Sequence, residues 1–245
     1  NTLEKNILVI GGPNAGKTHF GAQLYDRLNS RLFGYKIDPS QRPADLTIFK
    51  EALDKLYAGK RADHTEMSAN RDLELKILDK NGNKVNITFL DYAGEQINQI
   101  VANRKITPVW EKYVKNSNAW MLFVRLDEVA HVEDIINKGI PSAKEINKRK
   151  TQPPPIKISE AAHYVELLQM LLYAKGIPTL HKVNKPNLSI ALSCWDILNL
   201  SDNIKPINIL KERVPLLYYF IVNTWEDYSV IGLSSTERTL SEEPD

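Results

Sequence analysis

The sequence has little of three features that would each indicate a class of protein, the first being cysteine. Cys194 is the single cysteine, so the chain cannot form an internal disulfide or a cysteine-ligated zinc site, as is typical of a reducing compartment. No apolar run approaches the roughly 18 residues that span a bilayer, and the amino-terminal residues lack a signal peptide's long apolar region. We therefore expect a cytoplasmic protein with no membrane span.

An excess of charge of one sign is also missing. The 32 basic and 30 acidic residues give a formal net charge of +2, so no nucleic-acid partner is expected. The 42% hydrophobic and 25% charged fractions are those of a globular protein. The chain begins at Asn1 rather than Met and ends in a polar run, which is consistent with a segment trimmed from a longer protein.

Short apolar runs predict the strands of a buried sheet. Residues 6–10, 119–124 and 188–192 are apolar and short, as interior parallel strands covered by helices on both faces are. Residues 230–233 resemble a last short strand. The sequence therefore predicts a mostly parallel sheet.

Two further runs differ in their pattern. Residues 73–77 and 85–89 alternate apolar and polar side chains, which is typical of strands with one solvated face. Asn81-Gly82 between them favours a tight hairpin, because both residues tolerate positive φ. We therefore predict one antiparallel edge strand.

Apolar side chains at helical spacing predict a helix after the first strand and helices in three later segments. The first of these segments has Pro43 in its opening turn, and the second is capped by Ser159 and stopped by Gly176. The third, residues 206–224, is broken at Pro215. Strands that alternate with helices indicate the α/β class, with helices on both faces.

Two segments are longer than is needed to connect the predicted strands and helices. Residues 30–71 form an insertion before the hairpin with an added helix, and residues 128–158 form an exposed insertion between the fourth and fifth strands. No internal repeat or second domain is evident, so residues 1–245 are predicted to form a single domain.

The segment between the first strand and its helix matches the pattern G-x-x-x-x-G-K-[ST]. Glycines let successive backbone N–H groups turn toward a phosphate chain, and the helix N-terminus adds a positive field. Lys17 is expected to reach the terminal phosphates, and the Thr18 hydroxyl to ligate Mg²⁺. The predicted nucleotide-binding residues here are Gly11, Gly12, Pro13, Asn14, Ala15, Gly16, Lys17, Thr18 and the adjacent His19.

A second constellation follows the hairpin, in the sequence Asp91-Tyr92-Ala93-Gly94. A carboxylate at a strand's carboxyl end beside a phosphate loop is suited to bind Mg²⁺ through its outer shell. The N–H group of Gly94 can donate to a γ-phosphate. Asp91 is therefore a predicted metal residue, and Gly94 a predicted catalytic one.

With these two motifs and the hairpin, the chain resembles the Ras-like branch of the P-loop GTPases. The resemblance implies a P-loop NTPase fold of the Ras-like G-domain type, with GTP or GDP and Mg²⁺ as ligands. The branch's base motif, Asn/Thr-Lys-x-Asp, would map to residues 193–196, where only Asp196 is retained. A carboxylate can accept from both N1–H and the 2-amino group of guanine, so Asp196 favours GTP over ATP.

The remaining base-binding residues depart from that pattern. Cys194 replaces the lysine that covers the base, and Trp195 is a candidate for packing nearby or a plain core aromatic. The last motif of the branch would fall at Ser234-Ser235.

The combined motifs look most like the bacterial TRAFAC-class double-GTPases, which are grouped from their place in conflict and anti-phage loci. That resemblance implies a protein effector or an operon-encoded neighbour as partner. It also implies a terminal helix after the last motif, yet the chain stops ten residues after Ser235. Either this helix has been removed or the protein does without it.

Ras-like proteins need a switch threonine that ligates Mg²⁺ only when a γ-phosphate is present. Thr65 is best placed for that role, with Ser68 as the fallback. Arg61, Arg71 and Arg104 lie in or beside the predicted switches, where each could be an arginine finger or a surface ion-pair residue.

The water-orienting position also departs from the family. Glu95 stands where glutamine usually follows the glycine, and Gln96 comes next. We predict slow or partner-activated GTP hydrolysis, with Lys17, Thr65, Gly94 and either Glu95 or Gln96 in the catalytic site. A nucleotide-holding pseudo-GTPase scaffold is the alternative, and a P-loop ATPase or kinase is a weaker one.

Overall fold

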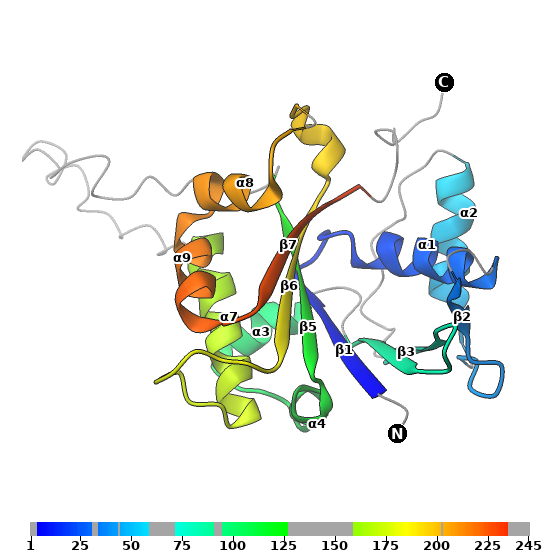
Figure 1. Ribbon diagram of the computed structural model, residues 1–245, viewed down its shortest axis with the longest axis horizontal. Helices are drawn as coiled ribbons and strands as arrows, with labels where there is room; N and C mark the ends of the chain where they lie inside the picture. The colour runs from blue at the N-terminus through cyan, green and yellow to red at the C-terminus, as the bar shows by residue number, and fades with distance from the viewer. Residues whose placement is uncertain are drawn as a thin grey trace, which may run out of the picture.

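The computed structural model describes residues 4–30, 34–43, 45–58, 72–90, 95–126, 159–201 and 203–234 (Figure 1). Its strands are β1 (Glu4–Gly11), β2 (Lys36–Ile37), β3 (Leu73–Leu78), β4 (Lys84–Phe89), β5 (Ala119–Arg125), β6 (Asn187–Ser193) and β7 (Tyr228–Leu233). Its α-helices are α1 (Lys17–Asn29), α2 (Thr47–Tyr57), α3 (Glu95–Asn103), α4 (Pro108–Asn116), α7 (Glu160–Lys175), α8 (Pro206–Arg213) and α9 (Pro215–Thr224). A short 3₁₀ helix, η2 (Trp195–Leu198), follows β6.

In the described part of the chain, one seven-stranded sheet has the order β2-β3-β4-β1-β5-β6-β7. β3 runs antiparallel to both of its neighbours, and every other adjacent pair is parallel. The predicted α/β fold with an antiparallel edge is confirmed. The outermost strand β2 was not predicted, because two residues are too few to show a pattern.

The predicted hairpin joins β3 to β4. Asp79 accepts hydrogen bonds at Oδ1 from the backbone N–H groups of Asn81 and Asn83, both at 2.8 Å. Gly82 has φ +80°, a conformation that favours glycine.

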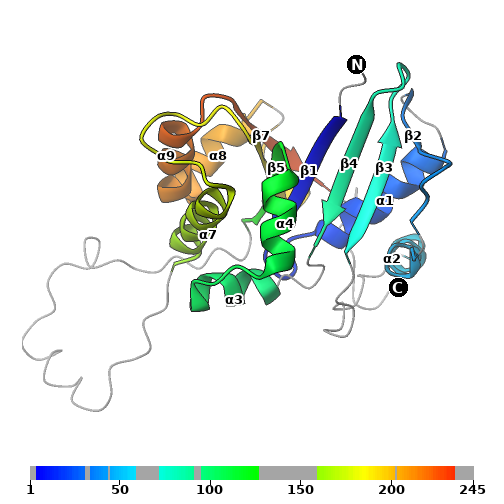
Figure 2. The same cartoon turned by 90° about the horizontal axis from the view of Figure 1, so that it is seen from below.

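Helices cover both faces of the sheet, as Figures 1 and 2 show. On one face, α3, α4, α7, α8 and α9 bury the larger apolar cluster, which includes Trp110, Trp120 and Trp225. On the other face, α1 and α2 cover a smaller cluster around Phe49 and Phe89. Two cores share one sheet, and β1 contributes to both.

Most predicted helix boundaries are confirmed. Ser159 Oγ accepts from the N–H of Ala162 at 3.2 Å, Gly176 ends α7 with φ +75°, and α9 begins at Pro215. The placement of Pro43 in a helical turn is wrong, since α2 begins at Thr47. Asp45 Oδ1 accepts there from the Thr47 N–H at 3.0 Å, which fixes the start of the helix beyond the proline.

Three asparagines cross-link the amino-terminal ends of the central strands. Asn6 on β1 donates its backbone N–H to Oδ1 of Asn118, just before β5, at 3.0 Å. Asn86 on β4 donates through Nδ2 to Oδ1 of Asn6 at 2.8 Å. This asparagine ladder fixes the register of three neighbouring strands at the edge where they begin.

Several predictions fall outside the described residues. The insertion 128–158 and the chain beyond residue 234 are among them, so the predicted single-domain extent remains a prediction. None of the helices in the described ranges has the length and apolar character needed to cross a membrane.

Candidate functional site

The carboxyl ends of the parallel strands meet at one edge of the sheet. Gly11 at the end of β1 pairs with Phe123 on β5, and Arg125 at the end of β5 pairs with Ser193 on β6. Ser193 in turn pairs with Leu233 on β7. The segments that follow β1, β6 and β7 therefore leave the sheet together, at the edge where open α/β sheets bind ligands.

Backbone conformation shapes the loop after β1, which we call the phosphate loop (residues 11–18). A Cβ at Gly11 would lie 2.9 Å from Phe123 Cβ, so only glycine lets β1 and β5 approach this closely. Asn14 and Gly16 have φ of +57° and +88°, and Gly16 is the N-cap of α1. The loop thus turns twice through left-handed conformations before the helix begins.

The first turn of α1 is suited to an anion. Gly16 has no side chain that could cap the helix, and the first turn holds no acidic residue. The leading N–H groups of the helix therefore face the loop with the positive end of the helix dipole. Thr18 and His19, both predicted to bind nucleotide, are half-buried in this turn.

Lys17 is folded back onto the phosphate loop. Its Nζ donates to the backbone oxygens of Gly11 at 2.6 Å and Gly12 at 2.7 Å, and the residue is 4% exposed. The loop is closed by a 3.4 Å bond from the Ala15 N–H to the Gly12 oxygen. A buried ammonium is thus held at the centre of the loop, where a phosphate chain would need a positive charge.

The predicted base-binding residues are brought together after β6 and β7. The backbone N–H of Asp196 donates to Ser234 Oγ at 3.1 Å, across 38 residues of sequence. Cys194 has φ +57° and is the N-cap residue that precedes η2. The sequence predicted Asp196 and Ser234 for the same ligand, and the structure places their segments in direct contact.

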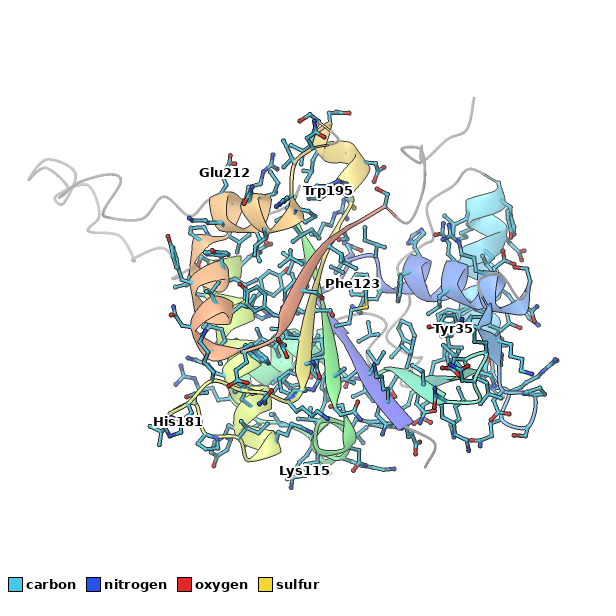
Figure 3. The ribbon with its side chains drawn as sticks, viewed as in Figure 1. Tyr35, Lys115, Phe123, His181, Trp195 and Glu212 are labelled. Atoms are coloured by element: carbon cyan, nitrogen blue, oxygen red, sulfur yellow. The ribbon has the colours of Figure 1, made fainter. Side chains whose placement is uncertain are left out.

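Trp195 lies at the same edge, at the end of the sheet toward which β6 and β7 run (Figure 3). A Cβ at Gly232 on β7 would lie 2.4 Å from Trp195 Cδ2, so the indole packs directly on the backbone of β7. The ring also contacts the larger core cluster. Trp195 thereby anchors the turn that carries Asp196.

The sequence matches the model of one protein family. The model of the family named Double-GTPase 1 matches residues 8–245, almost the whole chain. The chain belongs to the Double-GTPase 1 family. The resemblance inferred from the motifs is thereby confirmed.

Similarity to solved structures and to curated proteins is weaker. One similar solved structure is the small GTPase Arl6 (BBS3) of Trypanosoma brucei with the bound nucleotide analogue GppNp. It is 11% identical, with a TM-score of 0.44 over 95% of this chain and 88% of that chain. No curated protein matches the sequence.

Two predicted residues of the hydrolytic region are bound to other parts of the double-GTPase. Gln96 Oε1 accepts from Trp110 Nε1 at 2.9 Å, which links α3 to α4. Arg104 donates through Nε to Glu166 Oε1 on α7 at 2.8 Å, and its side chain is 79% exposed. Arg104 is thus a surface ion-pair residue here, and Gln96 would have to leave Trp110 to orient water.

The remaining predicted site residues lie outside the part of the chain that the structure describes. These are the switch residues Thr65 and Ser68, the metal residue Asp91, the phosphate sensor Gly94, the side chain of Glu95, the arginines Arg61 and Arg71, and Ser235. Their roles stay predictions.

Sequence reasoning missed an arginine that contacts the phosphate loop. Arg125 ends β5 and donates through Nη1 to the backbone oxygen of Asn14 in the phosphate loop at 3.3 Å. In the sequence it is only the first charged residue after an apolar run. Its closeness to the loop follows from the strand order, which no local pattern reveals.

Proposed function

We propose that this protein is a Mg²⁺-dependent switch that binds and hydrolyses GTP. The observation that carries the proposal is the hydrogen bond between Asp196 and Ser234, at the same sheet edge as the Lys17 loop. It supports a site with a phosphate-binding end and a base-binding end. The Asp196 carboxylate would accept from N1–H and the 2-amino group of guanine, a donor pair that adenine lacks.

At the phosphate end, a side chain, the phosphate loop and the first turn of α1 would each contribute to binding the phosphates. Lys17 would neutralise the β- and γ-phosphates, while the phosphate loop and the first turn of α1 donate backbone N–H groups. The residues present fit a magnesium ion, because Thr18 offers a half-buried hydroxyl oxygen beside Lys17. Thr18 would hold the ion together with Asp91 and Thr65, and the ion would offset charge on the phosphates.

Hydrolysis would proceed by in-line attack of water on the γ-phosphate. Lys17 would stabilise the charge that develops on the transferred group, and Gly94 would sense that group through its N–H. Glu95, or Gln96 after release from Trp110, would orient the water. Because glutamine is absent from the usual position, we expect slow turnover or activation by a partner.

The nucleotide state would be transmitted through residues 61–68 and 91–104, the two segments that the sequence predicts as switches. Their recipient would be a protein effector or a partner encoded in the same operon. The resemblance to double-GTPases of conflict and anti-phage loci supports a defence role for that pair.

The proposal is tested by nucleotide competition and phosphate release with the purified protein and Mg²⁺. GTP should displace a fluorescent GDP analogue at a concentration about 100-fold lower than ATP, since adenine leaves the carboxylate unpaired. Bound GTP should also release phosphate. Equal displacement by ATP would overturn the guanine assignment and favour a P-loop ATPase or kinase.

A second candidate function, a pseudo-GTPase scaffold, is favoured by the hydrogen bond that holds Gln96 on Trp110. Such a protein would bind GTP selectively and leave it intact. A single-turnover assay separates the two functions: complete conversion of bound GTP to GDP supports the switch, and intact GTP supports the scaffold.

A further inference from the structure

The base-binding end lacks a positive charge at the position where resembling GTPases carry lysine, since Cys194 stands there. A thiol supplies neither a cation nor a long stem to lie across a purine. A neighbouring strand, however, brings a cation to the same part of the sheet edge.

That cation is Arg125, the last residue of β5. It pairs with Ser193 on β6, and Ser193 directly precedes Cys194. Paired residues on adjacent strands lie about 5 Å apart. Arg125 therefore leaves the sheet beside the position where the lysine is missing.

The side chain of Arg125 also emerges on the face of the sheet that carries the phosphate loop and α1. Side chains alternate along a strand, so Arg125 shares its face with Phe123. The Phe123 ring lies 5.3 Å from the ring of Phe20 on α1, which identifies that face (Figure 3). From there the guanidinium reaches Asn14 O at 3.3 Å.

The contact joins the two ends of the site. Asn14 has φ +57° and lies in the phosphate loop, whereas Ser193 leads into the segment with Asp196. A guanidinium that contacts Asn14 and belongs to the residue paired with Ser193 has donors suited to a carbonyl and a flat cationic face suited to an aromatic base.

We infer that Arg125 replaces the missing lysine from a different strand, tying the phosphate loop to the base-binding end and covering the guanine ring. This inference rests on the proposed function and adds a base-positioning residue to it. Because Arg125 acts on the base and the loop rather than on the γ-phosphate, GDP and GTP should depend on it equally.

The experiment measures affinity and release rate of fluorescent GDP and GTP for six proteins. These are wild type, Arg125→Ala, Arg125→Lys, Cys194→Lys, the combination of Arg125→Ala with Cys194→Lys, and Arg213→Ala on α8 as the matched control. Arg125→Ala should weaken both nucleotides by about tenfold, the scale of one cation–π or charge-assisted contact, mainly through faster release. Arg125→Lys should keep part of the affinity.

The double variant provides the decisive readout. Restoring a lysine at position 194 should recover most of the lost affinity in the Arg125→Ala background and add little to wild type, whereas a gain of equal size in both backgrounds would show that the two positions act independently and would overturn the inference. Melting temperatures measured without nucleotide should be the same for Arg125→Ala and Arg213→Ala.

Two further results would overturn the inference while leaving the proposed function in place. One is guanine-selective binding that Arg125→Ala leaves within twofold of wild type, and the other is a loss that Cys194→Lys does not recover. Failure of the wild-type protein to bind guanine nucleotides would overturn the proposed function itself, and this inference with it.

Discussion

The phosphate end and the base end of the candidate site are built in opposite ways. The phosphate end is one continuous segment, residues 11–18, whose geometry comes from left-handed turns and a buried Lys17. The base end combines single residues from three places: Arg125 on β5, Asp196 after β6 and Ser234 after β7. The phosphate end can therefore be recognised from one stretch of sequence, whereas the base end depends on which strands are neighbours in the sheet.

The largest expected effect comes from removing the charge at the phosphate end. Lys17→Ala deletes a buried ammonium that would contact phosphate, and charge-assisted bonds are each worth about 1.5–3 kcal/mol, so GTP affinity should fall by about 100-fold or more. Phosphate release should fall with it. Isothermal titration measures the change.

The exposed Lys50 on α2 provides the control, as Lys50→Ala should leave affinity unchanged. Wild-type affinity in Lys17→Ala would contradict the assignment of residues 11–18 as a phosphate loop.

The next largest effect is expected from a substitution at the base-binding end, which should change the base that the protein prefers. Asp196→Asn replaces an acceptor for the guanine donors with an amide that can donate to the 2-carbonyl of xanthine. GTP should bind about 100-fold more weakly and XTP correspondingly better, because two hydrogen bonds change partners. Competition with both nucleotides measures the exchange, and an unchanged preference would place the base elsewhere.

A smaller effect is expected from the packing that supports the base end. Gly232→Ala would put a methyl group against Trp195, so the turn with Asp196 must move. Overpacking of this kind costs about 1–3 kcal/mol of folding free energy, and nucleotide release should accelerate several-fold. Denaturant unfolding and stopped-flow release measure the two changes.

Ile231→Val is the control for Gly232→Ala, since Ile231 is exposed on the same strand and the change keeps a β-branched side chain. Equal stability of Gly232→Ala and Ile231→Val would show that Trp195 has another stable position.

The smallest expected effect is that of Ser234→Ala. This change removes one hydrogen bond, from the Asp196 N–H to an exposed hydroxyl, at a cost of about 0.5–1 kcal/mol. Guanine nucleotides should bind two- to fivefold more weakly. A loss as large as that of Asp196→Asn would mean that the hydroxyl contacts the nucleotide itself.

Local patterns predicted much of the fold, because alternation in β3 and β4 and apolar runs in β1, β5 and β6 follow directly from which faces are buried. The start of α2 was misplaced, since Asp45 rather than Pro43 provides the hydrogen bond at its first N–H.

In the candidate site, too, local motifs were predictable and long-range contacts were not. Residues 11–18 were predicted as a phosphate-binding motif because all the residues of this loop are adjacent in the sequence. Arg125 and Gly232 could not be found, because their roles depend on the pairing of β5 with β6 and of Trp195 with β7.

The asparagine ladder at the opposite edge of the sheet has a consequence for how such a protein could move. Its three amide side chains do not titrate, and they join strands that begin far from the ligand. The bonds between the asparagines therefore do not depend on the protonation of a side chain, although Asn86 also donates to the Glu4 carboxylate at 2.7 Å. We expect this end of the sheet to serve as the fixed reference for any rearrangement at the carboxyl edge.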